Sequence, residues 1–443
     1  MSNTTKKTAT MEDGKPVSVP KLRFPEFREA EGWDESILGE LSEVVRGGSP
    51  RPIDGFMTTS ADGLNWLKIG DVDKEAKFVT QTAEKVRREA LTKTRVVNPG
   101  DLILSNSMSF GRPYILQITT CIHDGWIAIT KISKKTDRDF LYYLISAPGS
   151  QSYFLDNAAG SGVLNLNADI IKALSVCFPS SPEQKKIAAC FSSLDELMAA
   201  QARKLDALKS HKKGLMQQLF PREGETQPRL RFPEFQNAGE WDAERFDKLL
   251  EVIDGDRGAN YPKADEYSPS GFCLFLSAAN VSKTGFKFEV MQFISKEKDD
   301  ALRKGKLKRA DVVLTTRGTV GQFAFYSDEI PYENIRINSG MVILRTKTKK
   351  IAPEYLYSFS GSNVLSSYIK NTAFGNAQQQ LTVGEINKFQ LRYPSLDEQQ
   401  RIADCVTNLD DLIAAQTQKL DALKAHKKGL MQQLFPSPGE VEA

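Results

Sequence analysis

The amino-acid sequence predicts an α+β protein in which two homologous mixed α/β domains are joined by two long helices, paired as an antiparallel coiled coil. Two observations predict this architecture. An internal repeat spans most of the 443 residues, and each copy of the repeat ends in a long heptad segment almost free of helix-breaking residues. A repeat of this length is a whole domain plus a helix rather than a solenoid unit, so it predicts a pseudo-twofold internal repeat.

The repeat is marked by pairs of matching segments that occur in the same order in both halves. The pairs are "KLRFPEF" (21–27) with "RLRFPEF" (229–235), Trp33 with Trp241, "NWLKIGDV" (65–72) with "LFLSAANV" (274–281), "NPGDLILSNSMSFGR" (98–112) with "KRADVVLTTRGTVGQ" (308–322), and "FPSSPEQKK" (178–186) with "YPSLDEQQR" (393–401). Chance is a poor explanation for so many ordered matches, and we therefore infer a duplication.

Local patterns predict the elements of each half in order. Residues 1–20 are polar and lack the apolar region of a signal peptide, so we expect a disordered tail. Short apolar runs between turn residues predict strands, as in "DLILS" and "GWIAITKI" or "DVVLTT" and "GMVILRT", and "DFLYYLISA" and "PEYLYSFSG" each predict a short helix. The expected boundaries are a tail 1–20, domain 21–180, helix 181–221, linker 222–228, domain 229–395, helix 396–436 and tail 437–443.

The two long helices are predicted from an acidic first turn followed by apolar residues at alternating spacings of four and three. Each would be roughly 55 Å long at about 1.5 Å per residue. The heptad positions are Ile187, Phe191, Leu194, Met198, Leu205, Leu208, Leu215 and Leu219, and in the second copy Ile402, Val406, Leu409, Ile413, Leu420, Leu423, Leu430 and Leu434. We expect the helix or partner interface to include Leu194, Gln201, Leu205, Leu208, Leu215, Leu409, Gln416, Leu420, Leu423 and Leu430.

Polar residues interrupt both heptad seams at the same two places. Gln201 and Gln416 occupy one core-like position, and Lys212 and Lys427 occupy another. A polar residue at a core position costs stability and can fix the register of a coiled coil. For the lysines the alternative is that they extend to solvent from frayed helix ends.

One segment is copied almost without change. Residues 205–221, "LDALKSHKKGLMQQLFP", and residues 420–436, "LDALKAHKKGLMQQLFP", differ only at Ser210 and Ala425. We call them the first copy and the second copy. A solvated face has no reason to stay identical while its surroundings diverge, so two identical partner subunits, one per copy, would explain the identity. Recent gene conversion would explain it without any function.

Several classes of chemistry have no visible motif in the sequence. There is no phosphate-binding P-loop, no Asn-Pro-Pro-Tyr-like tetrapeptide or glycine-rich fingerprint for methyl transfer, and no run of apolar residues long enough for a membrane span. His123, His211 and His426 lack metal-ligand or triad spacing, and the "EQK" at 183–185 opens a helix rather than a nuclease site. The five cysteines stand far apart, as in a reduced cytoplasmic protein.

Charge alone does not indicate a nucleic-acid-binding protein, because 59 basic side chains nearly balance 56 acidic ones and leave a formal charge of +3. The divergent polar loops are more informative, since Arg, Lys, Asn and Gln are the side chains that read base edges. For any single residue, the ordinary alternative is a solvated turn. The candidate DNA-binding residues are Arg46, Ser49, Arg51, Lys68, Asp71, Ser105, Asn106, Ser109, Arg112, Asn165 and Asn167 in the first half, and Arg257, Asn260, Lys263, Asn280, Thr316, Arg317, Thr319, Gln322, Arg336, Asn338, Asn376, Gln378, Gln379 and Gln380 in the second.

As a whole, the sequence resembles the DNA-specificity subunit of type I restriction–modification enzymes. The resemblance rests on "LRFPEF…W", "GGSPRP…NWLKIGDV", "GDLILS…GR", "NLNADIIKALSVCFPSSPEQKKIA" and "LDELMAAQARKLDALKSHKKGLMQQLF", followed by second copies, and covers about residues 20–436. It implies two target-recognition domains that each read half of a split, asymmetric site in double-stranded DNA. It also implies that the helices act as a spacer and dock two methyltransferase subunits, which the restriction and translocation subunits join.

The resemblance further implies a non-catalytic chain without a cofactor of its own. Adenine-N6 methylation and ATP-driven cleavage, with S-adenosylmethionine, ATP and Mg²⁺, would belong to the partners. The second half has "SAAN" where the first has "KIGD", so individual contacts cannot be transferred between halves and the two half-sites should differ. The alternatives are a coiled-coil scaffold with two variable protein-binding domains, and a restriction-enzyme fragment with a degenerate active site.

Overall fold

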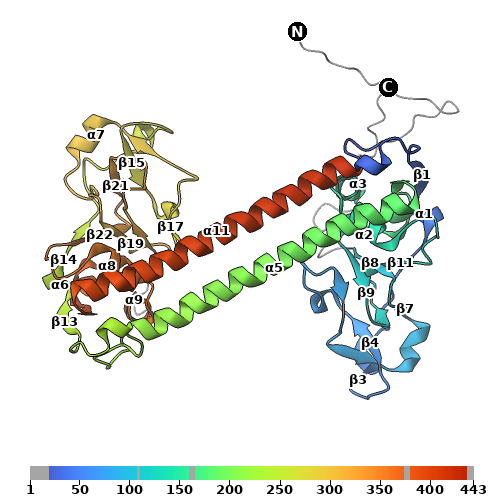
Figure 1. Ribbon diagram of the computed structural model, residues 1–443, viewed down its shortest axis with the longest axis horizontal. Coiled ribbons are helices and arrows are strands. Elements are labelled where there is room, and N and C mark those ends of the chain that lie inside the picture. The colour runs from blue at the N-terminus through green and yellow to red at the C-terminus, as the bar shows by residue number, and fades with distance from the viewer. Residues whose placement is uncertain (1–18, 107–109, 159–164, 374–379, 437–443) are drawn as a thin grey trace, which may run out of the picture. The chain divides into compact units, whose positions relative to one another are not determined.

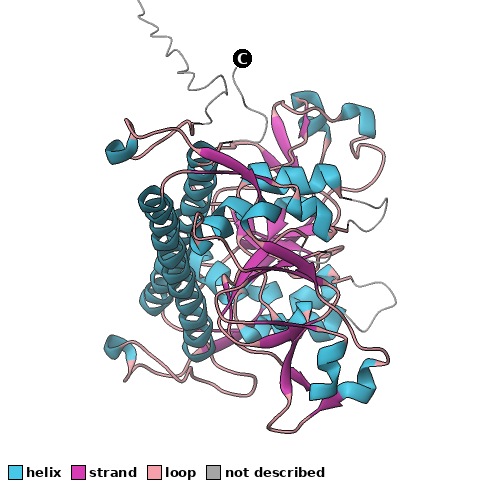
Figure 2. Cartoon of the chain, turned by 90° about the vertical axis from the view of Figure 1, so that its right-hand side faces the viewer, coloured by secondary structure: helices cyan, strands magenta, loops and turns pink. Residues whose placement is uncertain are grey.

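The computed structural model describes residues 19–106, 110–158, 165–373 and 380–436. The chain forms two compact units. The first unit contains the residues up to Ala202 together with those from Gln418 onward, and the second unit contains Arg203–Thr417. Both units mix helices with strands (Figure 2). Among the residues that the structure describes, no helix is long and apolar enough to cross a membrane.

The first unit is built on two five-stranded sheets and a strand pair (Figure 1). One sheet has the order β2 (Glu43–Arg46), β11 (Trp126–Thr130), β8 (Leu102–Ser105), β9 (Pro113–Leu116), β5 (Phe78–Val79); the other has β3 (Met57–Thr58), β6 (Glu84–Val86), β4 (Leu64–Leu67), β10 (Thr120–Ile122), β7 (Arg95–Val97); and β1 (Asp34–Ile37) pairs with β12 (Ser175–Phe178). The helices are α1 (Leu38–Leu41), α2 (Arg138–Ser146), α3 (Pro148–Asn157) and α4 (Ala168–Lys172), with 3-10 turns at Pro25–Phe27, Ile53–Phe56, Ile69–Asp71 and Arg88–Thr92.

The second unit has sheets of four and three strands and two strand pairs. The orders are β14 (Leu250–Asp254), β22 (Met341–Thr346), β19 (Val312–Thr315), β20 (Phe323–Phe325), and β18 (Phe293–Ile294), β15 (Cys273–Leu276), β21 (Ile335–Ile337); the pairs are β13 (Asp242–Arg245) with β23 (Gln390–Tyr393) and β16 (Val281–Ser282) with β17 (Gly285–Phe286). The helices are α6 (Phe246–Leu249), α7 (Lys296–Ala301), α8 (Pro353–Ser360), α9 (Asn363–Ala373) and α10 (Val383–Lys388), with 3-10 turns at Pro233–Phe235, Ala264–Glu266 and Ala278–Asn280.

The apolar runs identified in the sequence form the centres of these sheets. "DLILS" gives β8 and "GWIAITKI" gives β11, while their second-half counterparts give β19 and β22. Strands β8 and β19 are buried at every position, which is why their sequences are continuously apolar instead of alternating. The expected short helices are α2 and α8. The helices α3 and α9, which follow them directly, were not expected.

Two long helices complete the units, α5 (Ser181–Leu219) and α11 (Leu396–Leu434). Helix α5 begins in the first unit and ends in the second, and α11 does the reverse. In the first unit, Phe191 near the start of α5 stacks on Phe435, just beyond the end of α11, with ring centroids 5.7 Å apart. In the second unit, Phe220 at the end of α5 contacts Phe359 of α8. Each core therefore requires residues from both long helices.

A buried ion pair ties the "LRFPEF" segment to the start of a long helix in each unit. Arg23 donates to both carboxylate oxygens of Glu183 at 2.8 and 2.6 Å, and Arg231 does the same to Glu398 at 2.9 and 2.5 Å. The two hydrogen bonds of each pair offset the cost of burying both charges, and loss of either partner would leave the other charge buried without its counter-ion. Glu183 of the "EQK" motif thus has a structural role as the partner of Arg23.

Candidate nucleic-acid interface

Four candidate residues of the first unit converge on one turn, residues 123–125, which precedes β11. Ser49 Oγ donates to Asp124 Oδ1 at 2.8 Å, and an Arg51 nitrogen lies 3.3 Å from Asp124 Oδ2. The backbone oxygen of Asp124 accepts hydrogen bonds from Arg46 Nε at 2.9 Å and from Asn106 Nδ2 at 3.0 Å. The loops at 46–51 and 106 are therefore held against a residue that was not among the sequence candidates.

The turn itself depends on His123. Its Nδ1 accepts a hydrogen bond from the Gly125 amide at 2.7 Å, which requires a neutral ring with the proton on Nε2. Burial lowers the pKa of His123 and favours that neutral form, against the opposing effect of Asp124. The hydrogen bond from Ser49 lowers the pKa of Asp124, which keeps this carboxylate ionised. The turn thus presents one fixed negative charge to the loops around it.

The second unit has the same turn with different side chains. Asn338 Oδ1 accepts from the Gly340 amide at 2.9 Å, in the place of His123. Ser339 therefore takes the position of Asp124, and its carbonyl accepts from Arg257 at 3.3 Å. Arg257 also lies 3.2 Å from Asp254, so in this unit the nearby acid comes from the end of β14.

The loop after β8 and the loop after β19 share one backbone hydrogen-bond pattern. The amide of Asn106 donates to Gly125 at 3.0 Å, and the amide of Thr316 donates to Gly340 at 2.8 Å. The carbonyls of the same two residues accept from Leu166 and Leu381 at 3.0 and 3.1 Å. The alignment of 98–112 with 308–322 made from the sequence therefore describes equivalent backbones with different side chains.

The same correspondence holds for the second aligned pair of segments. The amide of Lys68 donates to Asp71 Oδ2 at 2.9 Å, and the amide of Ser277 donates to Asn280 Oδ1 at 2.9 Å. The Lys68 ammonium in addition forms an ion pair with Glu84 at 2.6 Å, which raises its pKa.

The candidates that are not buried are either exposed or half-buried. The exposed ones are Arg46, Arg51, Asn165, Asn167, Arg257, Asn260, Lys263, Arg317 and Thr319, and the half-buried ones are Ser49, Lys68, Asp71, Arg112, Gln322, Asn338 and Gln380. Arg317 and Gln380 form an isolated antiparallel bridge, so these two residues are neighbours in the second unit. Asn167 caps α4, its Oδ1 accepting from Ile170 at 2.8 Å. Ser109, Asn376, Gln378 and Gln379 lie outside the described residues.

The structure removes five candidates from the surface, namely Ser105, Asn106, Asn280, Thr316 and Arg336, all of which are buried. Because these side chains are buried within the protein, their positions do not fit the expectation that they face a ligand. Asn280 Nδ2 donates to the carbonyls of Lys287 and Val290 at 3.0 and 2.7 Å.

Arg336 is committed in the same way. It pairs with the buried Asp299 and donates to the carbonyls of Lys304 and Leu302 at 2.8 and 3.1 Å. Burial would raise the pKa of Asp299, but Lys306 and Arg336 together lower it. Arg336 thus neutralises an internal acid instead of facing solvent.

The heptad residues of both long helices lie on the shielded side of each helix. Gln201, Leu205 and Leu420 are buried, and the other expected interface residues Leu194, Leu208, Leu215, Leu409, Gln416, Leu423 and Leu430 are half-buried. The idea that the seam lysines extend to solvent from frayed ends is wrong. Lys427 Nζ lies 2.5 Å from Asp195 Oδ1 in the first unit, and Lys212 pairs with Asp410 in the second.

Packing explains part of the identity between the two copies. Met216, Leu219 and Phe220 belong to the core of the second unit, and Met431, Leu434 and Phe435 to the core of the first. Two similar cores impose similar side chains, a reason that sequence reasoning missed. Other identical pairs are exposed, and packing does not account for them: Lys209 with Lys424, His211 with His426, Lys213 with Lys428, and Gln218 with Gln433.

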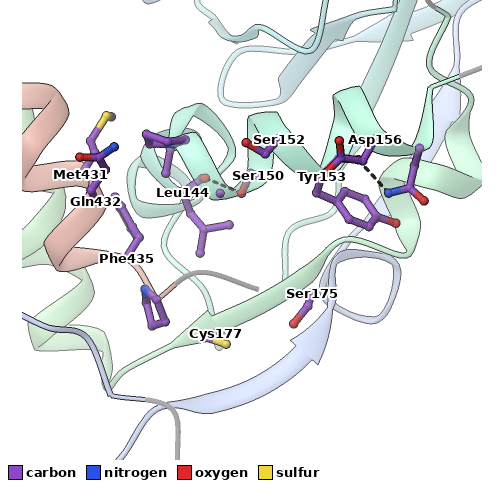
Figure 3. A pocket seen from close by; sticks show the side chains of 15 residues that line it. Leu144, Ser150, Ser152, Tyr153, Asp156, Ser175, Cys177, Met431, Gln432 and Phe435 are labelled. Carbon is purple, nitrogen blue, oxygen red and sulfur yellow. Dashed lines mark hydrogen bonds between the residues drawn. The ribbon is translucent and has the colours of Figure 1, made fainter. Parts of the chain in front are cut away.

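Each copy also borders a cavity. In the first unit a cavity of about 400 Å³ lies between the end of α11, helix α3 and strand β12, where Met431, Gln432 and Phe435 face Tyr153 and Cys177 (Figure 3). In the second unit a cavity of about 270 Å³ is lined by the matching Met216, Gln217 and Phe220 together with Ser362, Asn363, Val364 and Ser367 of the α9 region. Within the described ranges, no group of three or more His, Cys, Asp or Glu side chains is arranged to hold a metal ion.

Comparison with known proteins places this architecture in a family. The family model described as "Type I restriction modification DNA specificity domain" matches residues 30–210 and 240–425, one match in each half of the chain. The chain belongs to this type I DNA-specificity family. The DNA-specificity role that the sequence predicted is thereby confirmed.

Relatives and solved structures agree with the family assignment. The chain is 23% identical over 424 residues to the type I restriction enzyme MjaVIII specificity subunit of Methanocaldococcus jannaschii, covering 92% of this chain and 93% of that protein. Its fold resembles the S subunit of a type I restriction–modification system from M. genitalium, with a TM-score of 0.59, 15% identity, and coverage of 95% and 100%. A second structure, from work on complex assembly and conformational transition of the type I R-M system, gives a TM-score of 0.57 at 15% identity, covering 91% and 98%. Both solved structures contain the same mixed α/β fold.

Proposed function

We propose that the chain reads a bipartite, asymmetric site in double-stranded DNA, with one unit taking each half. The observation that carries this proposal is the common loop frame with divergent side chains. Where the first unit has Asp124 and Arg112, the second has Ser339 and Gln322 on equivalent backbone. Two recognition modules with one geometry and different polar groups suit two different half-sites.

The exposed side chains on these frames have the chemistry of base recognition. Arg51 in the first unit has a side chain that is 83% exposed and touches Asp124 through one nitrogen, which leaves guanidinium donors for guanine. In the second unit the adjacent Arg317 and Gln380 combine a guanine-reading and an adenine-reading group. We place the residues 21–180 and 229–395 in two target-recognition domains on this basis.

The duplex preference of the purified chain, assembled with its methyltransferase subunits, tests the proposal. Selection from a random duplex library should return a split site, and binding should weaken steeply as salt rises. Arg317→Ala should reduce discrimination at one half-site only, by about 1–3 kcal/mol if the side chain reads a base. An equal loss on all sequences would indicate a phosphate contact, and no preference among duplexes would refute the proposed function.

We also propose that α5 and α11 pair as an antiparallel coiled-coil spacer with pseudo-twofold symmetry, setting the distance between half-sites. The ion pairs Lys427–Asp195 and Lys212–Asp410 support it, because each joins the late part of one helix to the early part of the other. Within the first unit, the contacts Phe191–Phe435 and Asp195–Lys427 run in opposite directions along the two helices.

The docking of two methyltransferase subunits, one on each long helix, rests on a second stripe of residues outside the heptad seam. Leu197 of α5 and Leu412 of α11 occupy equivalent positions and are 46% and 49% exposed. They stand in matching series spaced by three, four or seven residues, Cys190, Leu197, Ala200, Lys204, His211 and Cys405, Leu412, Ala415, Lys419, His426. Small and apolar residues at this spacing present a surface to a partner helix. The stripe continues into the exposed, identical part of each copy, at His211 and His426.

Co-purification with a methyltransferase subunit tests the docking proposal. Leu197→Glu should lower the stoichiometry from two methyltransferase subunits to one, and adding Leu412→Glu should remove the second, because each introduces a charge into one docking face. Val290→Glu places the same charge at an exposed apolar position of the second unit, 69% exposed, and should leave both subunits bound. Full stoichiometry in the double variant would exclude this face as the docking surface.

In this proposal the chain is non-catalytic and works in the cytoplasm. Adenine-N6 methylation and ATP-dependent cleavage, with S-adenosylmethionine, ATP and Mg²⁺, belong to the methyltransferase and restriction–translocation subunits. The second candidate, a coiled-coil scaffold with two protein-binding domains, is favoured by the exposed leucines of the long helices. It predicts partner binding without any duplex preference.

A further inference from the structure

The turn at residues 123–125 is the point where the recognition loops of the first unit meet. Two loops separated by more than fifty residues in sequence contact Asp124, one through Ser49 and Arg51 and the other through Asn106. Ser49 and Arg51 contact the carboxylate of Asp124, whereas the side chains of Arg46 and Asn106 donate to its backbone carbonyl. One residue therefore determines where the exposed Arg46 and Arg51 stand before any ligand arrives.

We propose that Asp124 is the positioning residue that sets sequence discrimination at the half-site read by the first unit. This inference rests on the proposed function. Asp124 holds Ser49 and the exposed Arg51 in one arrangement. Bases that fit this arrangement bind without further ordering of the two side chains, whereas other bases require them to rearrange at a cost in free energy. It also keeps a negative charge beside the duplex, which disfavours contacts that depend on phosphate attraction alone.

The geometry supports a positioning role rather than a purely structural one. The Asp124 side chain is 39% exposed, and its ion pair with Arg51 uses a single nitrogen at 3.3 Å. An acid that served only to neutralise a buried base would be enclosed, as Asp299 is beneath Arg336 in the second unit. Asp124 instead touches the arginine on one side and leaves the rest of the guanidinium open to a ligand.

The second unit provides an internal comparison. At the equivalent turn Ser339 offers its carbonyl to Arg257, and the acid that pairs with the guanidinium of this arginine, Asp254, lies three residues before it in the chain. The carboxylate of Asp124 links parts of the chain that are 75 residues apart, whereas Asp254 acts within one loop. A change at Asp124 should therefore affect one half-site and leave the other unchanged.

The test uses the full chain with its methyltransferase subunits and the duplex selected by the wild-type protein. Asp124→Asn is compared with the wild type on duplexes altered in one half-site or the other. We expect discrimination to fall about tenfold or more at the half-site of the first unit and to stay unchanged at the second, while binding to unrelated duplex at low salt becomes tighter. Asp34→Asn removes the same charge from β1 and should change neither half-site.

A second variant keeps the proposal testable if Asp124→Asn disturbs folding. Arg51→Gln alters a side chain that is 83% exposed and should produce the same loss at the same half-site. Equal losses at both half-sites, or unchanged discrimination in both variants, would overturn the positioning role. Failure of the wild-type protein to prefer any duplex is a different result, and it refutes the proposed function itself.

Discussion

At the scale of single residues, the two units solve one structural problem with different side chains. The turn before the central strand needs an acceptor for a glycine amide, and His123 provides it in the first unit where Asn338 provides it in the second. The two acceptors differ in their response to pH. An amide oxygen does not titrate near neutral pH, whereas an imidazole nitrogen does.

This difference predicts a pH dependence confined to the first unit. Burial lowers the pKa of His123 from its ordinary value of 6.5, with Asp124 and Asp71 opposing the shift and Lys68 adding to it. The unfolded chain therefore binds the proton more readily, so the contribution of His123 to stability is complete above about pH 6.5 and is lost as the pH falls below it. Protonation at Nδ1 also removes the hydrogen bond from Gly125.

Urea unfolding of the wild type and of His123→Asn between pH 8 and pH 5 measures the effect. Asn copies the acceptor that the second unit uses, so the variant should lose less stability than the wild type on acidification. Parallel curves for the two proteins would mean that His123 does not couple the turn to pH.

The residue scale also marks the limit of what sequence alone predicts. Polarity identified Arg51 and Arg317 as exposed loop residues, but it equally selected Asn280 and Arg336, which the structure buries. A polar side chain in a glycine-rich stretch looks the same whether it faces water or a buried carbonyl. Asp124 was missed because its partners lie 18 to 78 residues away in sequence, and no local pattern records such a contact.

At the scale of elements, the long helices were predicted closely because heptads and helix starts are local signals. The observed bounds are Ser181–Leu219 and Leu396–Leu434, against the expected 181–221 and 396–436. Periodicity did not predict that residues at the ends of the helices belong to the cores of the units. Phe220 and Phe435 lie at the C-terminal ends of the heptad segments and serve as core residues of the units.

The proposed spacer makes a prediction at this scale. One heptad inserted between residues 202 and 203, together with one between 417 and 418, should lengthen the preferred spacing by about 10 Å, or about three base pairs, without altering either half-site. The two positions lie at the boundaries between units, so the ion pairs Lys427–Asp195 and Lys212–Asp410 remain intact.

A single insertion is the matched control. A heptad in α5 alone leaves α11 too short to pair with it, and should reduce stability instead of giving a new spacing. Selection of the unchanged site by the doubly lengthened protein would exclude the spacer role.

At the scale of the whole molecule, the first unit is built from two separate stretches of sequence, whereas the second unit is the continuous stretch Arg203–Thr417. The first unit needs residues 418–436, whose Met431, Leu434 and Phe435 are buried in its core. A truncation after residue 417 should therefore unfold the first unit, because losing one buried Phe alone costs about 3–5 kcal/mol. The second unit ends at Thr417 and should remain folded.

Hydrogen exchange followed by peptide mapping distinguishes the two units in the truncated chain. Fast exchange is expected in β8 and β11, and protection should persist in β19 and β22. Phe435→Ala in the full-length chain is a milder control that should weaken protection in the first unit only. Loss of protection in both units would show that they unfold together.

The same division has a consequence for the order of the sequence. The Leu22 amide donates to the Gln433 carbonyl at 2.9 Å, and the Leu230 amide donates to the Gln218 carbonyl at 3.0 Å. Leu22 and Gln433 lie more than four hundred residues apart in the sequence, whereas Gln218 and Leu230 are separated by a short connection. If a similar connection joined residue 436 to residue 20 and the chain were cut between 219 and 229, both bonds would persist. We therefore expect a circularly permuted chain of this kind to retain the fold of each unit.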